Sequence, residues 1–162
     1  MTEGVVGDER SELMTYSYSG EVLGEFLFSA LTTENSNPKH RAILEAMRRV
    51  EEITRDRLKP MLVRHGISLG DQAAIREEAM KIAKELNVQP WREMWVDLLP
   101  AIEAALDKFI RLRELVADPK DGEVCDFLVK HEEALKEFVL ATRDERDGAM
   151  SKVEAYLREA SE

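Results

Sequence analysis

The chain has 162 residues, of which 44% are hydrophobic, so it is long enough for one domain with a substantial core. Its formal net charge of −10 argues against a nucleic-acid partner and against binding to an anionic membrane surface, because both need a basic face. A single cysteine, Cys125, rules out an internal disulfide bond and a CxxC metal site, and it fits a cytoplasmic location.

The elements predicted along the chain are all helical. Residues 1–9 are acidic and lack a long apolar run, so we expect a flexible tail there and neither a signal peptide nor a membrane span. A single domain then follows over residues 10–160. Helices are predicted over residues 11–32, 38–64, 70–86, 90–116, 123–142 and 150–159, separated by turns rich in Asn, Asp, Gly and Pro.

No segment shows the alternation typical of a strand, so the fold class is expected to be all-α. Four of the six helices are long, and the connection between the second and third of these is also long. This pattern predicts a four-helix bundle with one crossover, an extra helix within the crossover and a short helix at the C-terminus.

Carboxylates recur at one angular position on three of the long helices. At about 100° per residue, Glu51, Glu103 and Glu132 lie on the same flank of the apolar stripe of their helices. On the first helix, which is apolar almost all round, Glu21 and Glu25 lie one turn apart among apolar residues. A buried carboxylate needs a cation, a hydrogen bond or a metal ion, so these five residues are candidate metal ligands.

Two further residues are candidates for chemistry beside these carboxylates. His131 lies within the apolar stripe of its helix, where it is either a hydrogen-bonded core residue or a metal ligand. Tyr18 shares a face of the first helix with Glu21 and Glu25. The alternative for the carboxylates is pairing with basic neighbours, for which Arg48, Arg55, Arg111 and Lys136 are available.

Over residues 15–142 the chain resembles the ferritin-like four-helix proteins, in the broad sense that includes rubrerythrin and bacterioferritin. In that family the first and third helices each give a Glu, and the second and fourth each give a Glu-x-x-His motif. Here the matching positions are Glu21 or Glu25, Glu103, Glu51 and Glu132, with Thr54 and Leu135 in place of the two histidines. His131, one residue before Glu132, is the candidate replacement ligand.

The resemblance implies iron or manganese as the cofactor and an oxidoreductase or oxygenase activity on a small molecule. The implied ligands are Glu21, Glu25, Glu51, Glu103, His131 and Glu132, with Tyr18 and His131 as the catalytic candidates. The alternative is a metal-free ferritin-like protein whose interior carboxylates bind a small molecule such as an organic cation, or which acts as a non-redox enzyme or an assembly module. A homodimer is the expected oligomer.

Overall fold

The computed structural model describes the backbone of residues 2–161 and the side chains of residues 8–161. The described residues form helices and no strand, as predicted. The helices are α1 (Thr2–Glu34), α2 (Pro38–Arg64), α3 (Gln72–Leu86), α4 (Trp91–Leu115), α5 (Pro119–Arg143) and α6 (Ser151–Ala160). Residues 2–9, expected to form a tail, are instead the first turns of α1. Within the described part of the chain, no helix is long and apolar enough to cross a membrane.

Short polar side chains define where three of the helices begin. Asn37 accepts two backbone N–H bonds from the first turn of α2, at 2.9 and 3.2 Å. Asp71 accepts one at 3.2 Å from the first turn of α3, and Asp118 accepts one at 2.7 Å from that of α5. These caps satisfy N–H groups that have no partner inside the helix, and Asn37 is the cap from which the start of α2 was predicted. The start of α5 was placed at residue 123, whereas α5 begins four residues earlier, at Pro119, because Asp118 caps it.

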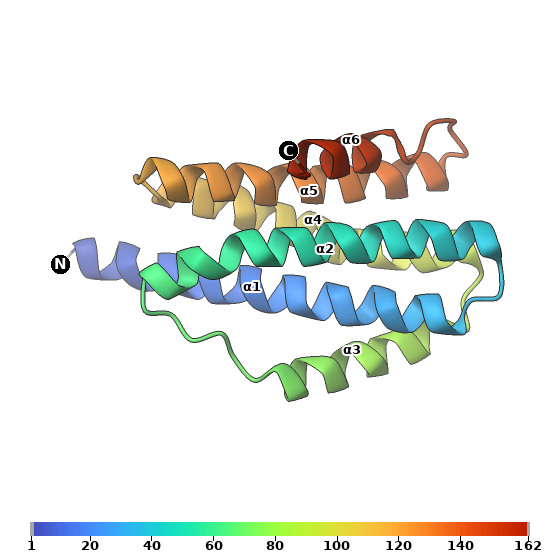
Figure 1. Ribbon diagram of the computed structural model, residues 1–162, viewed down its shortest axis with the longest axis horizontal. Helices are drawn as coiled ribbons and strands as arrows, with labels where there is room; N and C mark the ends of the chain where they lie inside the picture. The colour runs from blue at the N-terminus through green and yellow to red at the C-terminus, as the bar shows by residue number, and fades with distance from the viewer. Residues whose placement is uncertain (1, 162) are drawn as a thin grey trace.

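The helices pack as pairs, with the shorter ones added at the periphery (Figure 1). α1 lies along α2, α4 lies along α5, and α3 packs chiefly against α1, on the side away from α5. α6 folds back along α5 and also contacts α2. Because α3 lies within the connection between them, α2 and α4 run in the same direction, as expected for a chain with one crossover.

The hydrophobic core has two clusters. One includes Leu27, Phe28, Leu31, Leu44, Met47, Val50, Leu135 and Phe138, and the other includes Met14, Tyr18, Val22, Leu58, Met61, Phe109, Cys125 and Leu128. On α1, α2 and α5, buried polar residues occur where one cluster gives way to the other. These residues, Glu21, Glu51, Thr54, His131 and Glu132, are called the polar layer below.

Candidate metal centre

The ionisable side chains of the polar layer come from three helices. Glu21 belongs to α1, Glu51 to α2, and the adjacent residues His131 and Glu132 to α5. Their exposed fractions are 2%, 4%, 0% and 6%, respectively. α4 closes the site with an apolar contact, because the Phe109 ring lies with its centroid 5.6 Å from that of His131. The four titratable groups are therefore held together and largely shielded from water.

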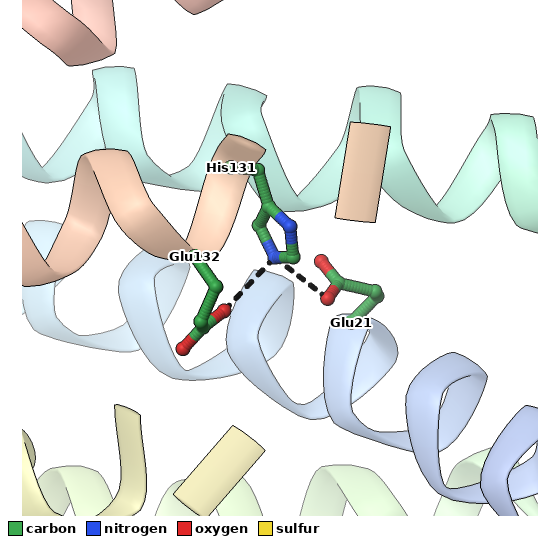
Figure 2. Close-up of side chains that lie close together, drawn as sticks. All are labelled: Glu21, His131 and Glu132. Atoms are coloured by element: carbon green, nitrogen blue, oxygen red, sulfur yellow. Dashed lines mark ion pairs between the residues drawn. The ribbon is translucent and has the colours of Figure 1, made fainter. Parts of the chain in front are cut away.

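The imidazole of His131 is the centre of this group, and Figure 2 shows carboxylates on both sides of it. Its Nε2 atom lies 2.8 Å from Oε1 of Glu21, 3.1 Å from Oε2 of Glu132 and 3.9 Å from Oε2 of Glu51. Its Nδ1 atom lies 2.5 Å from the backbone carbonyl oxygen of Leu128. Since a carbonyl oxygen only accepts, Nδ1 carries a hydrogen, and Nε2 is the nitrogen left to bind a proton or a metal ion.

Two polar atoms of the site lack a hydrogen-bond partner among the described residues, namely Nε2 of His131 and Oε2 of Glu21. Two ligands at right angles around one ion, each about 2.1 Å from it, are about 3.0 Å apart. The distances of 2.8 and 3.1 Å match that separation. One oxygen or nitrogen each from Glu21, His131 and Glu132 lies within 4.8 Å of the others, so the three residues can ligate a common ion.

The carboxylates of the site have no lysine or arginine as an ion-pair partner among the described residues. Within this part of the chain, the ion pairs made by Glu21, Glu51 and Glu132 all go to His131. Burial, together with the charge of Glu21, raises the pKa of Glu51 well above its usual range. Burial also raises the pKa of Glu132. Burial alone would lower the pKa of His131, but the negative charges of Glu21 and Glu132 raise it well above its usual range.

Glu25, expected as a ligand, lies outside this group. Its carboxylate pairs with Arg55 and lies 3.6 Å from Nη1 of Arg48, with both arginines on α2. Glu25 is half-buried, whereas Glu21 one turn earlier is fully buried. The alternative that the sequence left open, pairing with arginine, therefore describes Glu25.

Glu103 also lies outside the group, contrary to the expectation that it faces the interior. Its side chain is 49% exposed, and its Oε2 lies 3.7 Å from Nζ of Lys136. The physical reason is the rotation of α4. Ala105 lines the interior cavity described below, and a position two residues away on a helix is turned by about 200°. Glu103 therefore points away from the carboxylates.

Of the two tyrosines near Glu21 in the sequence, Tyr16 is the one that lines the cavity beside the site. Tyr18, expected as a catalytic residue, is buried in the hydrophobic cluster that contains Met14 and Val22. Burial raises the pKa of Tyr16, and the charges of Glu132 and Glu21 raise it further. The sequence signal for Tyr16 was its spacing of four residues from Gly20, which places both on one face of α1.

Thr54, which stands where the resemblance places a histidine, makes a hydrogen bond to α6. Its hydroxyl donates to the Val50 carbonyl oxygen at 2.7 Å, so the Tyr156 hydroxyl, 2.5 Å away, donates to Thr54. The ring of Tyr156 has its centroid 6.2 Å from that of His131. The sequence placed Tyr156 on the apolar side of the last helix, and its part in covering the site from α6 was not predicted.

A cavity of about 440 Å³ extends from the carboxylates to the space between α1, α3 and α4. Glu21, Glu51 and Glu132 line it, together with apolar residues from the three helices. A larger hollow, of about 830 Å³, lies over α3 alone and involves none of these carboxylates. The smaller cavity is thus the one that gives a molecule access to the site.

Comparisons of the chain with known protein families, curated proteins and solved structures find no match. The fold and the site therefore define the protein only as an all-helical chain with a buried carboxylate and histidine cluster beside a cavity.

Proposed function

We propose that this protein is a metal-dependent oxidoreductase whose iron or manganese is bound by Glu21, His131 and Glu132. The observation that carries the proposal is a buried group of three carboxylates and one imidazole with no lysine or arginine paired to it among the described residues. A divalent cation would supply the missing positive charge and would occupy the direction in which Nε2 has no partner.

The chemistry of the donors favours iron or manganese. Carboxylate oxygens suit manganese, imidazole suits iron, and both metals are found in carboxylate sites between helices. Three protein ligands leave further coordination positions open, and the cavity meets the site on its carboxylate side. A bound metal would therefore pass electrons to dioxygen or peroxide while a small molecule in the cavity is oxidised.

We propose further that α1, α2, α4 and α5 form a ferritin-like four-helix bundle, with α3 in its crossover. In support, these four helices have 33, 27, 25 and 25 residues and are the long elements of the described chain. The donors come from α1 and α5, with Glu51 of α2 beside them, whereas α4 contributes Phe109. This donor set fits one metal ion better than the pair of ions that a carboxylate from every helix would hold.

The test is metal content by mass spectrometry on protein purified without chelator and again after anaerobic loading with iron(II) or manganese(II). We expect about one equivalent in the wild type and its loss in Glu21→Gln and in His131→Asn, because each removes a donor. Glu25→Gln and Glu103→Gln are the matched controls and should retain the metal, since both carboxylates lie outside the site. A wild type without metal after loading contradicts the proposal, as does unchanged binding in both site variants.

The second candidate function is that of a metal-free protein that binds a small molecule or acts as a non-redox enzyme. The cavity is the observation that favours it, since its volume of about 440 Å³ lies in the usual range for ligand sites. Unchanged thermal stability in chelator, combined with no metal after loading, would select this function over the first.

The homodimer remains a prediction. Self-association of a helical bundle through its amphipathic faces most often gives a closed pair. Light scattering at working concentration measures the mass, and a monomer there would contradict it.

A further inference from the structure

The cavity beside the candidate metal centre is lined mostly by apolar residues, and the charged residues that line it are all glutamates. Its apolar walls come from α1, α3 and α4 and include Leu23, Leu27, Ile75, Ile82, Leu98 and Ile102. Glu21, Glu51 and Glu132 line it as well, and Glu78 is an exposed lining residue on α3. A molecule that fills this space must therefore present apolar surface along its length and a group compatible with carboxylates at one end.

Among the described residues, no lysine, arginine or histidine lines the cavity. The nearby Lys108 lies against the ring of Tyr16, with its Nζ 4.2 Å from the ring centroid, and is not part of the lining. An anionic head group would thus face like charges with no compensating cation, which costs several-fold in affinity or more. Fatty acids, phosphates and other anions are disfavoured as ligands.

At the end of the cavity beside the candidate metal centre, one metal ion would not balance the charges of all the buried carboxylates. One divalent ion held by Glu21 and Glu132 balances two of the three buried carboxylates. Glu51 is 4% exposed, lines the cavity and is not part of the group of residues that can share one ion. Oε2 of Glu21, which also lines the cavity, accepts no hydrogen bond from the described residues. A cationic hydrogen-bond donor would stabilise Glu51 in its ionised form, which burial otherwise disfavours, and would donate to the free acceptor on Glu21.

We propose that the cavity binds an apolar amine, with its ammonium group against Glu51 and Glu21 and its hydrocarbon part between α1, α3 and α4. This inference deepens the proposed function, because it names the class of small molecule that the metal site would act on. The amine site also exists without the metal, because the carboxylates and the apolar walls belong to the protein. The ammonium group can donate up to three hydrogen bonds, and the apolar walls add affinity in proportion to the surface they bury.

The glycines on α1 explain how the cavity stays open. Gly20 and Gly24 lie one turn apart, and both line it. A Cβ atom at Gly24 would lie 2.7 Å from Cδ of Glu51, so the missing side chain leaves room for the Glu51 carboxylate. A Cβ atom at Gly20 would meet nothing within 4 Å, and Gly20 is an exposed lining residue, so a larger side chain there has open space at the edge of the cavity.

The test compares three probes of equal length, octylamine, octan-1-ol and octanoate, by isothermal titration calorimetry below their aggregation concentrations. We expect octylamine to bind at least about tenfold more tightly than octan-1-ol, and octanoate not to bind. Glu51→Gln keeps the shape of the side chain and should remove most of the preference for the amine while octan-1-ol still binds. Equal binding of octan-1-ol or octanoate by the wild type would overturn the proposal, as would an unchanged preference in Glu51→Gln.

A second pair of variants locates the binding. Gly20→Leu fills cavity space while adding a better helix former, so it should fold and lose octylamine binding. Gly20→Ala is the matched control and should bind octylamine nearly as the wild type does. Undiminished binding in a folded Gly20→Leu protein would place the amine elsewhere and overturn the proposal.

Each titration is done on metal-loaded protein and on protein in chelator, with metal content measured on the same samples. Amine selectivity without any metal binding would support the inference and contradict the oxidoreductase proposal. Metal binding without amine selectivity would support the oxidoreductase and overturn the inference. The two claims can therefore fail separately.

Discussion

The protein without metal or ligand should lose stability as the pH rises above the ordinary titration range of a carboxyl group, because the raised pKa of Glu51 favours its protonated form in the folded state. Burial and the charge of Glu21 raise the pKa of Glu51 well above the ordinary value of 4.5. Over this pH range the unfolded chain has an ionised carboxylate at that position, whereas the folded chain retains the proton. The folded state thus binds more protons, and this group lowers the free energy of unfolding by at most about 1.4 kcal/mol per pH unit.

The assay is urea unfolding in chelator at several pH values, with the wild type compared with Glu51→Gln. The amide does not titrate, so the free energy of unfolding of the variant should fall less steeply with pH, by at most about 1.4 kcal/mol per pH unit. Glu132 and His131 interact electrostatically with Glu51, so the difference between the two proteins reports the titration of the whole buried group. Glu103→Gln is the control, because its side chain is 49% exposed, and its profile should run parallel to that of the wild type. Parallel profiles for the wild type and Glu51→Gln would refute the reasoning about the buried charge.

Three further outcomes are expected. Metal affinity, measured by competition with a chelator, should rise with pH through neutrality. The carboxylates raise the pKa of His131, and its Nε2 must lose a proton before it can bind a metal ion, so a flat pH profile would exclude His131 as a ligand. Gly20→Ala should raise the free energy of unfolding by about 0.5–1 kcal/mol, whereas Gly24→Ala should not raise it, because the added Cβ meets the Glu51 carboxyl group. An equal increase in melting temperature for the two variants would contradict the close contact between position 24 and Glu51. Burial raises the pKa of the Cys125 thiol to about 12, so native protein should resist a thiol reagent at neutral pH, and rapid labelling would contradict its burial.

The helices could be predicted from the sequence because their signals are local. Apolar residues repeat at helical spacing, and Asn37 and Asp71 cap the helices that follow them, whereas Asp118, taken as part of a turn, caps α5 four residues before its predicted start. The predicted start of the first helix, at residue 11, was wrong. Residues 2–9 show little apolar periodicity, so no local signal placed them in a helix, and yet they are part of α1.

The site could be predicted only in part. Glu21, Glu51, His131 and Glu132 were recognised because a charged side chain on an apolar stripe stands out in one helix taken alone. Whether a residue on the flank of a stripe faces the interior depends on how each helix is rotated against its neighbours. That rotation is set by packing between helices and leaves no signal within one helix, which is why Glu103 was misplaced.

The walls of the cavity and the cluster of ionisable groups are built from largely different parts of the chain. α3 contributes Ile75, Glu78 and Ile82 to the walls, contributes none of the four clustered groups, and packs chiefly against α1. Exchanging this fifteen-residue helix would therefore alter which molecules are admitted while leaving the donors in place. On the proposed function, substitutions in this one peripheral segment would change the ligand selectivity of the cavity without changing the metal donors.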